Sequence, residues 1–272
     1  MNEYVCLVGL DEPEYREIEA RLDVPVLAHE TLPRIRVDDD QLWVEARNSA
    51  RFLPVSKMVY HGIFENDLDF IAGLALWGGD CLPHARGMLD CRLKIPCLVR
   101  ALQHTRFGMP RGYASPRAYF ESPTERVAKW GNWHCGENKA LFSGEFSNDE
   151  ATIIEDYLVG QAVRVVLIGD QHWQIRLEGD DWLKSIHHAD ADFMPVDRDL
   201  LDDTRRIRAA FGLEIIANDY IVTEDGDKYL LEVNHIPNVT RFPQIWEAYR
   251  DFVVAWLSAP QSETTAINVP LP

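Results

Sequence analysis

The 272-residue sequence lacks the features that would direct a protein to a membrane or to nucleic acid. Its longest apolar run, residues 70–79, is too short to span a bilayer, and its first residues lack the basic region of a signal peptide. The net charge is −17, from 27 basic and 44 acidic residues, so phosphate backbones and anionic lipids would repel the chain. We therefore expect a cytoplasmic protein that binds neither nucleic acid nor membranes.

Cysteine is scarce, and its spacing matches no metal-binding pattern. The five cysteines are odd in number and form no C-x-x-C pair and no Cys/His arrangement typical of zinc. Free thiols in a reducing compartment fit this usage best. The chain also lacks the G-x-S-x-G, H-E-x-x-H and G-x-G-x-x-G patterns, so hydrolase, zinc-protease and dinucleotide-binding functions have no support.

The composition that remains, 46% apolar and 26% charged residues, is that of an ordinary globular protein. Strands and helices alternate up to about residue 85, which predicts a small α/β domain over residues 1–85, and residues 258–272 are predicted to form a tail. The predicted strands cover residues 4–10, 24–28, 34–37, 42–46, 57–60, 111–114, 126–129, 152–158, 162–168 and 172–177. The predicted helices cover residues 12–22, 67–77, 89–103, 200–211 and 244–257.

Two apolar, β-rich segments near the C-terminus flank an Asp-Gly pair and predict a hairpin. If Asp225 and Gly226 are the two turn residues, Asp219 lies directly opposite Glu232, and Asn234 shares the face of Glu232. Like charges in such a pair repel, which favours a cation between them and predicts that losing one charge raises stability without metal. Carboxylate and amide oxygens are hard ligands that suit magnesium. The alternative interpretation is a solvated hairpin with incidental acids.

A glycine-bearing loop follows Lys129, which ends a predicted strand. Gly131 and Gly136 have the spacing of P-loop glycines, but the Lys and Ser/Thr that should follow are missing, so that motif fails. Such a loop can still cover phosphates with main-chain N–H groups, and His134 is a candidate phosphate contact. A surface hairpin loop is the alternative.

A short acidic segment and three arginines complete the candidate set. Main chain flanked by apolar residues can pair with the edge of adenine, arginines suit phosphates, and an arginine can hold a carboxylate through two hydrogen bonds. By themselves, the segment and the first two arginines are equally a strand with charged residues. For the last of the three arginines, a surface position in a loop is the alternative. The candidates are Glu155, Asp156, Tyr157 and Leu158 in the segment, and Arg164, Arg176 and Arg241 among the arginines.

The order of these parts resembles the ATP-grasp superfamily, and within it the branch of the ribosomal-protein glutamate ligase and glutathione synthetase. The resemblance covers about residues 83–257 and is strongest from Leu230 to Pro237, which looks like the family's Glu-x-Asn metal strand. It implies that Asp219, Glu232 and Asn234 bind magnesium, with manganese as a substitute.

The resemblance also implies the fold and the nucleotide contacts. The fold class would be α/β (α+β), with the N-terminal domain followed by a lid subdomain (residues 86–155) and a C-terminal subdomain (residues 156–257) that together clasp ATP. The implied nucleotide-binding residues are Lys94, Lys129, Glu155, Asp156, Tyr157, Leu158 and Lys184. The implied phosphate- or substrate-side residues are Arg164 and Arg176, while His134 and Arg241 stay candidates from the residue pattern alone. The loop after Lys129 is poorer in glycine than is usual in the family and is closer to the synapsin version, and the N-terminal domain matches no specific substrate.

The activity that the resemblance implies is a carboxylate–amine ligase. A substrate carboxylate would attack the γ-phosphate of ATP to give an acyl phosphate and ADP, and an amine would then displace phosphate to give an amide. The acid and the amine would be small molecules or peptides, and a dimer is compatible with this function. Two rival classes are a non-catalytic ATP-binding module, as the synapsin likeness allows, and a small-molecule kinase on the same fold.

Overall fold

The computed structural model describes residues 3–131 and 138–260, which belong to two units. The first unit joins the chain up to Leu89 with the chain from Gln244 onward, and the second spans Asp90–Pro243. The further division into residues 86–155 and 156–257 stays a prediction.

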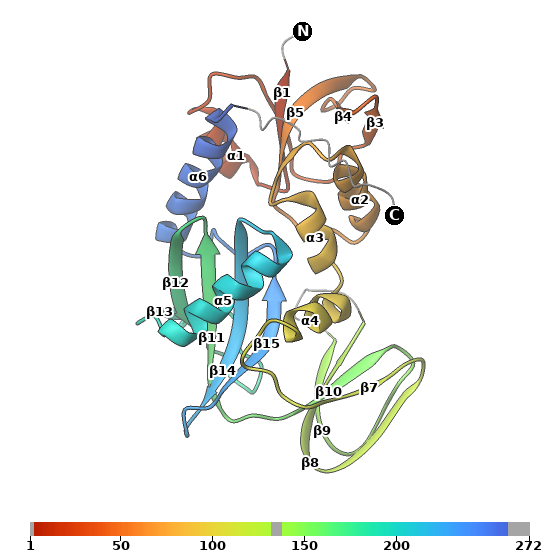
Figure 1. Ribbon diagram of the computed structural model, residues 1–272, viewed down its shortest axis with the longest axis vertical. Coiled ribbons are helices and arrows are strands. Elements are labelled where there is room, and N and C mark those ends of the chain that lie inside the picture. The colour runs from red at the N-terminus through yellow and green to blue at the C-terminus, as the bar shows by residue number, and fades with distance from the viewer. Residues whose placement is uncertain (1–2, 132–137, 261–272) are drawn as a thin grey trace, which may run out of the picture. The chain divides into compact units, whose positions relative to one another are not determined.

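The first unit is built on a six-stranded mixed sheet with the order β2-β1-β5-β4-β3, in which β6 also pairs with β5. Strands β1, β3, β4 and β5 of this sheet are labelled in Figure 1. Strands β1, β2, β5 and β6 run parallel, whereas β3 and β4 form an antiparallel hairpin. The strands are β1 (Tyr4–Val8), β2 (Val26–His29), β3 (Ile35–Asp38), β4 (Gln41–Glu45), β5 (Phe52–Tyr60) and β6 (Asp80–Leu82). The helices of this part of the chain are α1 (Glu12–Glu19), α2 (Leu68–Trp77), α3 (Ala85–Cys91), which crosses into the second unit, and α6 (Pro243–Ser258).

Helix α6 belongs with the first unit although it lies at the other end of the sequence. The ammonium group of Lys57, on β5, donates hydrogen bonds to the main-chain carbonyls of Trp256, Leu257 and Ala259 at 2.9, 3.2 and 2.5 Å. The last carbonyls of a helix have no partner within the helix, so a buried lysine satisfies them and interacts well with the helix dipole. This contact fixes the end of α6 to the sheet.

The second unit contains two antiparallel sheets, with strand orders β7-β10-β8-β9 and β13-β12-β11-β14-β15. The four-stranded sheet comprises β7 (Arg111–Ala114), β8 (Ala118–Trp130), β9 (Lys139–Asn148) and β10 (Thr152–Asp156). The five-stranded sheet comprises β11 (Gly160–Ile168), β12 (Gln171–Arg176), β13 (Asp192–Met194), β14 (Ile215–Thr223) and β15 (Lys228–Asn234). Two helices accompany them, α4 (Lys94–Leu102) and α5 (Arg198–Phe211).

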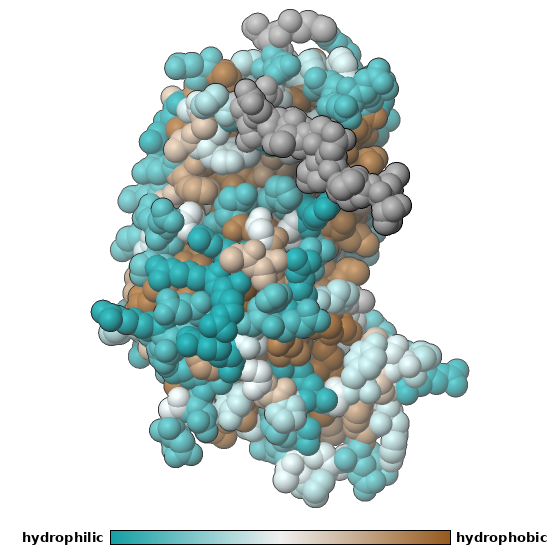
Figure 2. Space-filling model, in the orientation of Figure 1, coloured by the Kyte–Doolittle hydropathy of each residue, from teal (hydrophilic) through white to brown (hydrophobic). Residues whose placement is uncertain are grey.

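The five-stranded sheet has two different faces, set by the alternation of side chains. Helix α5 lies across one face (Figure 1) and buries Leu200, Thr204 and Ile207, and its outward side is strongly hydrophilic (Figure 2). The cross-strand pair Val163 and Tyr220 belongs to this helix face, and both side chains are fully buried. The next residue of each strand turns to the opposite face, which leaves that face available for a ligand.

The sequence prediction missed most of the β8–β9 hairpin. It placed a strand only over residues 126–129, whereas β8 extends over 13 residues and β9 over 10. Many side chains of both strands are half-buried or exposed, and the pairing is irregular between Ser122 and Arg126, so neither strand shows a clean alternation of apolar and polar residues. Strands β6 and β13, of three residues each, were also missed. Among the described residues, no helix is long and apolar enough to cross a membrane.

Candidate functional site

A pocket of about 470 Å³ lies between the two sheets of the second unit. Its apolar lining includes Val127, Ala162, Leu177, Ile221 and Leu231. Its charged lining consists of Lys129, Lys139, Glu155, Asp156, Asp180, Asp181, Lys184, Asp219 and Glu232. Pockets that combine apolar walls with a few convergent polar groups are typical ligand sites. The combination fits a ligand with an apolar part and a charged part.

The segment that joins the two sheets forms one edge of the pocket. Tyr157, Leu158 and Val159 lie between β10 and β11 and line the pocket, and Val159 is 66% exposed. Gly160 follows where the chain passes close to β14: a Cβ atom at this position would lie 2.3 Å from the carbonyl oxygen of Val222. Only glycine fits this approach. The segment thus presents irregular backbone to the pocket, as a hydrogen-bonding edge for a ligand requires.

Glu155 lies beneath this edge between two cations. Its carboxylate is 2% exposed, accepts a hydrogen bond from Arg111 Nε at 2.5 Å and forms an ion pair with Lys129. Burial acts to raise the pKa of this carboxyl, but the charges and hydrogen bonds of Lys129 and Arg111 together hold the pKa below its ordinary value. Glu155 is therefore ionised and compensated, and it joins β7, β8 and β10.

The hairpin near the C-terminus forms as predicted, although its turn differs. Strand β14 ends at Thr223 and β15 begins at Lys228, so the turn has four residues rather than the two predicted. Near the turn, Ile221 is paired with Tyr229, where the prediction paired Val222 with Tyr229. A register shift in the middle of the hairpin then corrects this offset. The predicted pairing of Asp219 with Glu232 is confirmed.

The register shift is a β-bulge whose extra residue is Leu231. Leu230 pairs with Tyr220 and Glu232 pairs with Asp219, so Leu231 has no partner across the ladder. Its neighbour Glu232 therefore faces the pocket as Leu231 does. The carbonyls around the bulge accept hydrogen bonds from the four-stranded sheet: Leu230 O from Arg111 at 2.8 Å, and Leu231 O from Lys129 at 3.4 Å. The same two cations thus bind Glu155 and the bulge.

Both carboxylates of the predicted metal site have protein cations beside them. Arg164, on β11, donates to both oxygens of Asp219 at 2.6 and 2.8 Å, and Lys139 Nζ lies 3.3 Å from Glu232 Oε2. Burial acts to lower the pKa of the Arg164 guanidinium, but Asp219 and, more weakly, Glu232 raise it. The sequence prediction that losing one carboxylate would relieve repulsion therefore needs correction, because removal of Asp219 would leave Arg164 buried without its partner.

The residues still fit a hard divalent cation. Asp219, Glu232 and Asn234 share the pocket face of the sheet, since Ala217 opposite Asn234 and Asp219 opposite Glu232 are two residues apart. Asn234 is 7% exposed, and its Nδ2 atom has no hydrogen-bond partner among the described residues. Within residues 3–131 and 138–260, no three His, Cys, Asp or Glu side chains form a metal cluster, so the third ligand would be the amide oxygen of Asn234.

Comparison with solved structures finds the same architecture over almost the whole chain. D-alanyl-alanine synthetase A from Vibrio cholerae superposes with a TM-score of 0.65 at 12% identity, covering 94% of this chain and 98% of that one. The macrocyclase MdnC from Microcystis aeruginosa, bound with precursor peptide MdnA, gives 0.62 at 15% identity and 93% and 99% coverage. The ATP-grasp ligase PsnB, complexed with a variant of its minimal precursor, Mg and ADP, gives 0.61 at 14% identity and 94% and 99% coverage.

The chain has the ATP-grasp fold. This confirms the predicted fold class, with a mixed N-terminal sheet and two antiparallel sheets. Models of known protein families give no match to the sequence, and neither do curated protein sequences.

The structure brings some of the other predicted residues to the pocket. Lys94 begins α4 and, with Lys129 and Glu232, lines a small void of about 10 Å³, and Lys184 lies at the pocket with its ammonium group 2.9 Å from the carbonyl oxygen of Gly179. Asp156 is exposed and paired with Arg126 at 3.1 Å. His134 lies outside the described residues.

Two predicted arginines lie away from the pocket lining. Arg176 is paired with Val163, whose side chain lies on the helix face. The Arg176 side chain therefore points to the face of the sheet that does not carry Asp219. It instead forms an ion pair with Glu178 at 2.9 Å. Arg241 donates to the carbonyl of His188 at 3.4 Å. Of the three arginines, Arg164 alone contacts a predicted metal ligand.

Two cations were not predicted from sequence as site residues: Lys139, which lines the pocket, and Arg111, which binds Glu155 and the Leu230 carbonyl. Lys139 faces Lys129 directly across the β8–β9 ladder, so a hairpin register through residues 130–138 would have found it. Arg111 has no such signal, because its role depends on Glu155 and Leu230, which are 44 and 119 residues away in sequence.

Proposed function

We propose that the chain is an ATP-dependent carboxylate–amine ligase that forms an amide or peptide bond and releases ADP and phosphate in the cytoplasm. The observation that carries this proposal is the pocket between the two sheets. It has apolar walls at the linker, which is the segment 157–159 between β10 and β11, and cations beside the Asp219–Glu232 pair. The same arrangement would hold adenine against Leu158 and the triphosphate against the lysines. We also propose that the chain belongs to the branch of the ribosomal-protein glutamate ligase and glutathione synthetase. The reason is that Glu232, Val233 and Asn234 match the Glu-x-Asn metal strand of that branch.

Each group in the pocket has a distinct task in this proposal. Lys129 and Lys139 bind and orient the phosphates, and Arg164 holds Asp219 in place. The linker excludes water from the adenine. Asp219, Glu232 and Asn234 would hold magnesium, which neutralises charge on the transferring phosphoryl group. Phosphoryl transfer depends mainly on positioning and charge neutralisation, so the pocket needs no side-chain nucleophile.

The acid substrate is proposed to be carried on a peptide. Support comes from three similar structures: MdnC is bound with a precursor peptide, PsnB with a variant of its minimal precursor, and a ligase from Chryseobacterium gregarium with a leader and core peptide. Arg241, in the loop after Asn234, remains a candidate for the carboxylate contact, whereas Arg176 lies on the opposite face of the sheet from the pocket. A second candidate function, a non-catalytic ATP-binding module, is favoured by one observation: protein cations already neutralise Asp219 and Glu232.

A trapping experiment tests the ligase proposal. Incubation with ATP, Mg²⁺, hydroxylamine and a set of amino acids and acidic peptides should give ADP and a hydroxamate, because an acyl phosphate forms from the acid alone. Mass spectrometry and ADP quantification read both products. AMP as the main product would contradict the mechanism, and ATP binding without turnover for every acid would favour the non-catalytic module.

Lys129→Met should weaken ATP binding and leave the fold intact. The substitution removes a charge of the proposed phosphate site and keeps the length of the side chain. It also unpairs one side of Glu155, but Arg111 still compensates that carboxylate. Calorimetric titration with ATP measures the loss. Lys184→Met, which changes an exposed lysine of the pocket lining, is the matched control with a smaller expected effect. Unchanged affinity in Lys129→Met would remove Lys129 from the phosphate site.

A further inference from the structure

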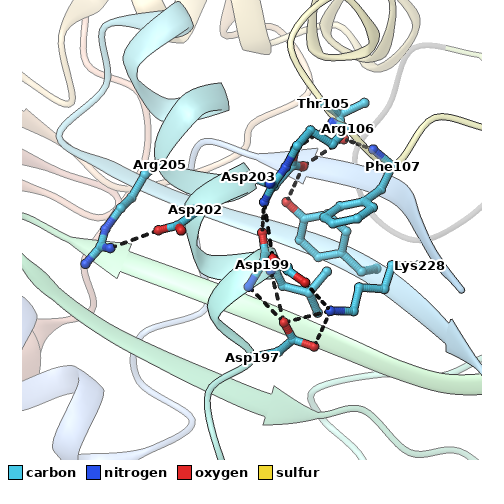
Figure 3. A network of polar contacts seen from close by, with 11 residues as sticks. Thr105, Arg106, Phe107, Asp197, Asp199, Asp202, Asp203, Arg205 and Lys228 are labelled. Atoms are coloured by element: carbon cyan, nitrogen blue, oxygen red, sulfur yellow. Dashed lines mark hydrogen bonds and ion pairs between the residues drawn. The ribbon is translucent and has the colours of Figure 1, made fainter. Parts of the chain in front are cut away.

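A buried polar network lies on the helix face of the five-stranded sheet, opposite the pocket (Figure 3). Its centre is Asp203 of α5 and Tyr220 of β14, both 0% exposed. The Tyr220 hydroxyl donates to Asp203 Oδ2 at 3.1 Å and accepts from Asn218 Nδ2 at 3.2 Å. Its one proton is used on Asp203, so Thr204 Oγ1, at 3.0 Å, must donate to it as well. The hydroxyl thus has no unused hydrogen-bonding position.

Asp203 also holds the connection that leads from α4 into the four-stranded sheet. It accepts hydrogen bonds from Thr105 Oγ1 and from the Arg106 main-chain N–H, both at 2.7 Å (Figure 3). The Phe107 carbonyl then accepts from the Leu230 N–H at 2.7 Å. Three consecutive residues are therefore fixed to α5 and to β15 just before β7 begins. This carboxylate is the common anchor of α5, β14 and the start of the other sheet.

Tyr220 directly follows Asp219 in β14, and the two side chains point to opposite faces of the sheet. The pairing of β14 with β15 is irregular between Asp219 and Tyr220, because the bulge at Leu231 lies opposite them. A disrupted ladder restrains backbone rotation less well than a regular one. The hydrogen bonds of the Tyr220 hydroxyl supply a restraint at this point, since rotation of β14 that displaces Asp219 would also pull Tyr220 away from Asp203.

The geometry points to Asp203 and Tyr220 as positioning residues for the charged end of the pocket. They fix the orientation of Asp219 from behind the sheet, and Asp203 ties that orientation to residues 105–107 and so to the start of β7. Neither side chain reaches the pocket. The inference rests on the proposed function, because it assigns the network to the binding of metal and phosphate.

Tyr220→Phe is the sharpest test, since it removes one oxygen atom and keeps the ring. Asp203→Asn removes the charge and keeps the size. We expect both variants to bind Mg²⁺·ATP about tenfold more weakly or worse, the range seen when groups that orient metal ligands are lost. Adenosine, which has no phosphates, should bind with unchanged affinity. Calorimetry measures both ligands, at a temperature where circular dichroism shows every variant folded.

The chain offers a matched control one residue away. Asp202→Asn is the same substitution on the same helix, but Asp202 is 61% exposed and, among the described residues, forms its ion pair with Arg205 at 3.2 Å (Figure 3). It should leave both affinities unchanged. The double variant Tyr220→Phe/Asp203→Asn should bind Mg²⁺·ATP no more weakly than the worse single variant, because the two residues act as one unit.

The outcomes separate the inference from the function on which it rests. Unchanged Mg²⁺·ATP affinity in Tyr220→Phe, or equal weakening for adenosine, would overturn the positioning role and leave the proposed function standing. A wild-type protein that binds no Mg²⁺·ATP would overturn the proposed function itself, before any variant is compared. If Asp203→Asn fails to fold, Tyr220→Phe alone decides.

Discussion

Asp219→Asn should abolish magnesium-dependent turnover and, in addition, lower the melting temperature of the metal-free protein. The loss of a proposed metal ligand should reduce turnover by more than about 100-fold, beyond the effect of residues that only orient ligands. The stability loss has a separate cause. Arg164 donates two hydrogen bonds to Asp219, and both side chains are largely buried. Removing one partner of such a pair costs about 3–5 kcal/mol, which corresponds to roughly 6 °C or more in melting temperature.

Glu232→Gln is the matched variant that separates the two effects. It removes the carboxylate directly across the ladder, so turnover should fall as in Asp219→Asn. Lys139 makes one contact with Glu232 at 3.3 Å, whereas Arg164 makes two hydrogen bonds to Asp219 at 2.6 and 2.8 Å, so the stability cost should be smaller. Differential scanning fluorimetry without metal, together with ADP release, gives both readouts. Equal melting temperatures in the two variants would mean that Arg164 does not depend on Asp219, and full turnover in both would end the metal-site proposal.

Glu155→Gln should destabilise the protein by about 3–5 kcal/mol, because it leaves two buried cations without their common anion. Arg111 and Lys129 are 8% and 10% exposed at their side chains, so water cannot compensate them. The same cations bind the carbonyls of Leu230 and Leu231, so hydrogen exchange should rise in β7 and in the middle of β15. Chemical denaturation and hydrogen exchange measure the two effects.

The pH dependence of Glu155→Gln follows from the lowered pKa of Glu155. Because the folded-state pKa lies below the ordinary value of 4.5, the carboxylate stabilises the fold fully above about pH 4.5. That contribution is lost as the pH falls through the folded-state pKa, so wild type and variant should converge in acid. Asp156→Asn is the control at the adjacent residue. The Asp156 side chain, which pairs with Arg126, is 54% exposed, so the free energy of unfolding should change by no more than about 1 kcal/mol. A constant stability gap down to pH 2 or so would contradict the argument.

The candidate metal pair could be predicted from sequence because local rules determine most of it. An Asp-Gly turn between two apolar segments identifies a hairpin, and the alternation of side chains then places Asp219 opposite Glu232. The predicted pairing was right although the predicted turn was wrong, since the bulge offsets the longer turn. The prediction placed the register near the turn one residue off and did not foresee the bulge, and these two errors cancelled. Nothing in the sequence marks Leu231 as the extra residue.

The compensating charges could not be predicted in this way, because they come from distant parts of the chain. Arg164 reaches Asp219 across 55 residues, and Arg111 reaches Glu155 across 44. A sequence shows that an acid is flanked by apolar residues, but not which cation the other strands bring to it. The strand β9 was missed for a related reason: its stability comes from pairing with β8 rather than from a strong apolar pattern of its own.

The bulge at Leu231 makes two properties of the pocket inseparable. Consecutive strand residues normally point to opposite faces, yet Leu231 and Glu232 both line the pocket. An apolar wall and a charged ligand are thereby separated by a single peptide bond. In the proposed ligase, a substitution that shifts this bond to accommodate a different base would also move the carboxylate proposed to bind the metal beside the phosphates. Selectivity for the base and affinity for the phosphates would then be coupled traits, and a change in one would alter the other.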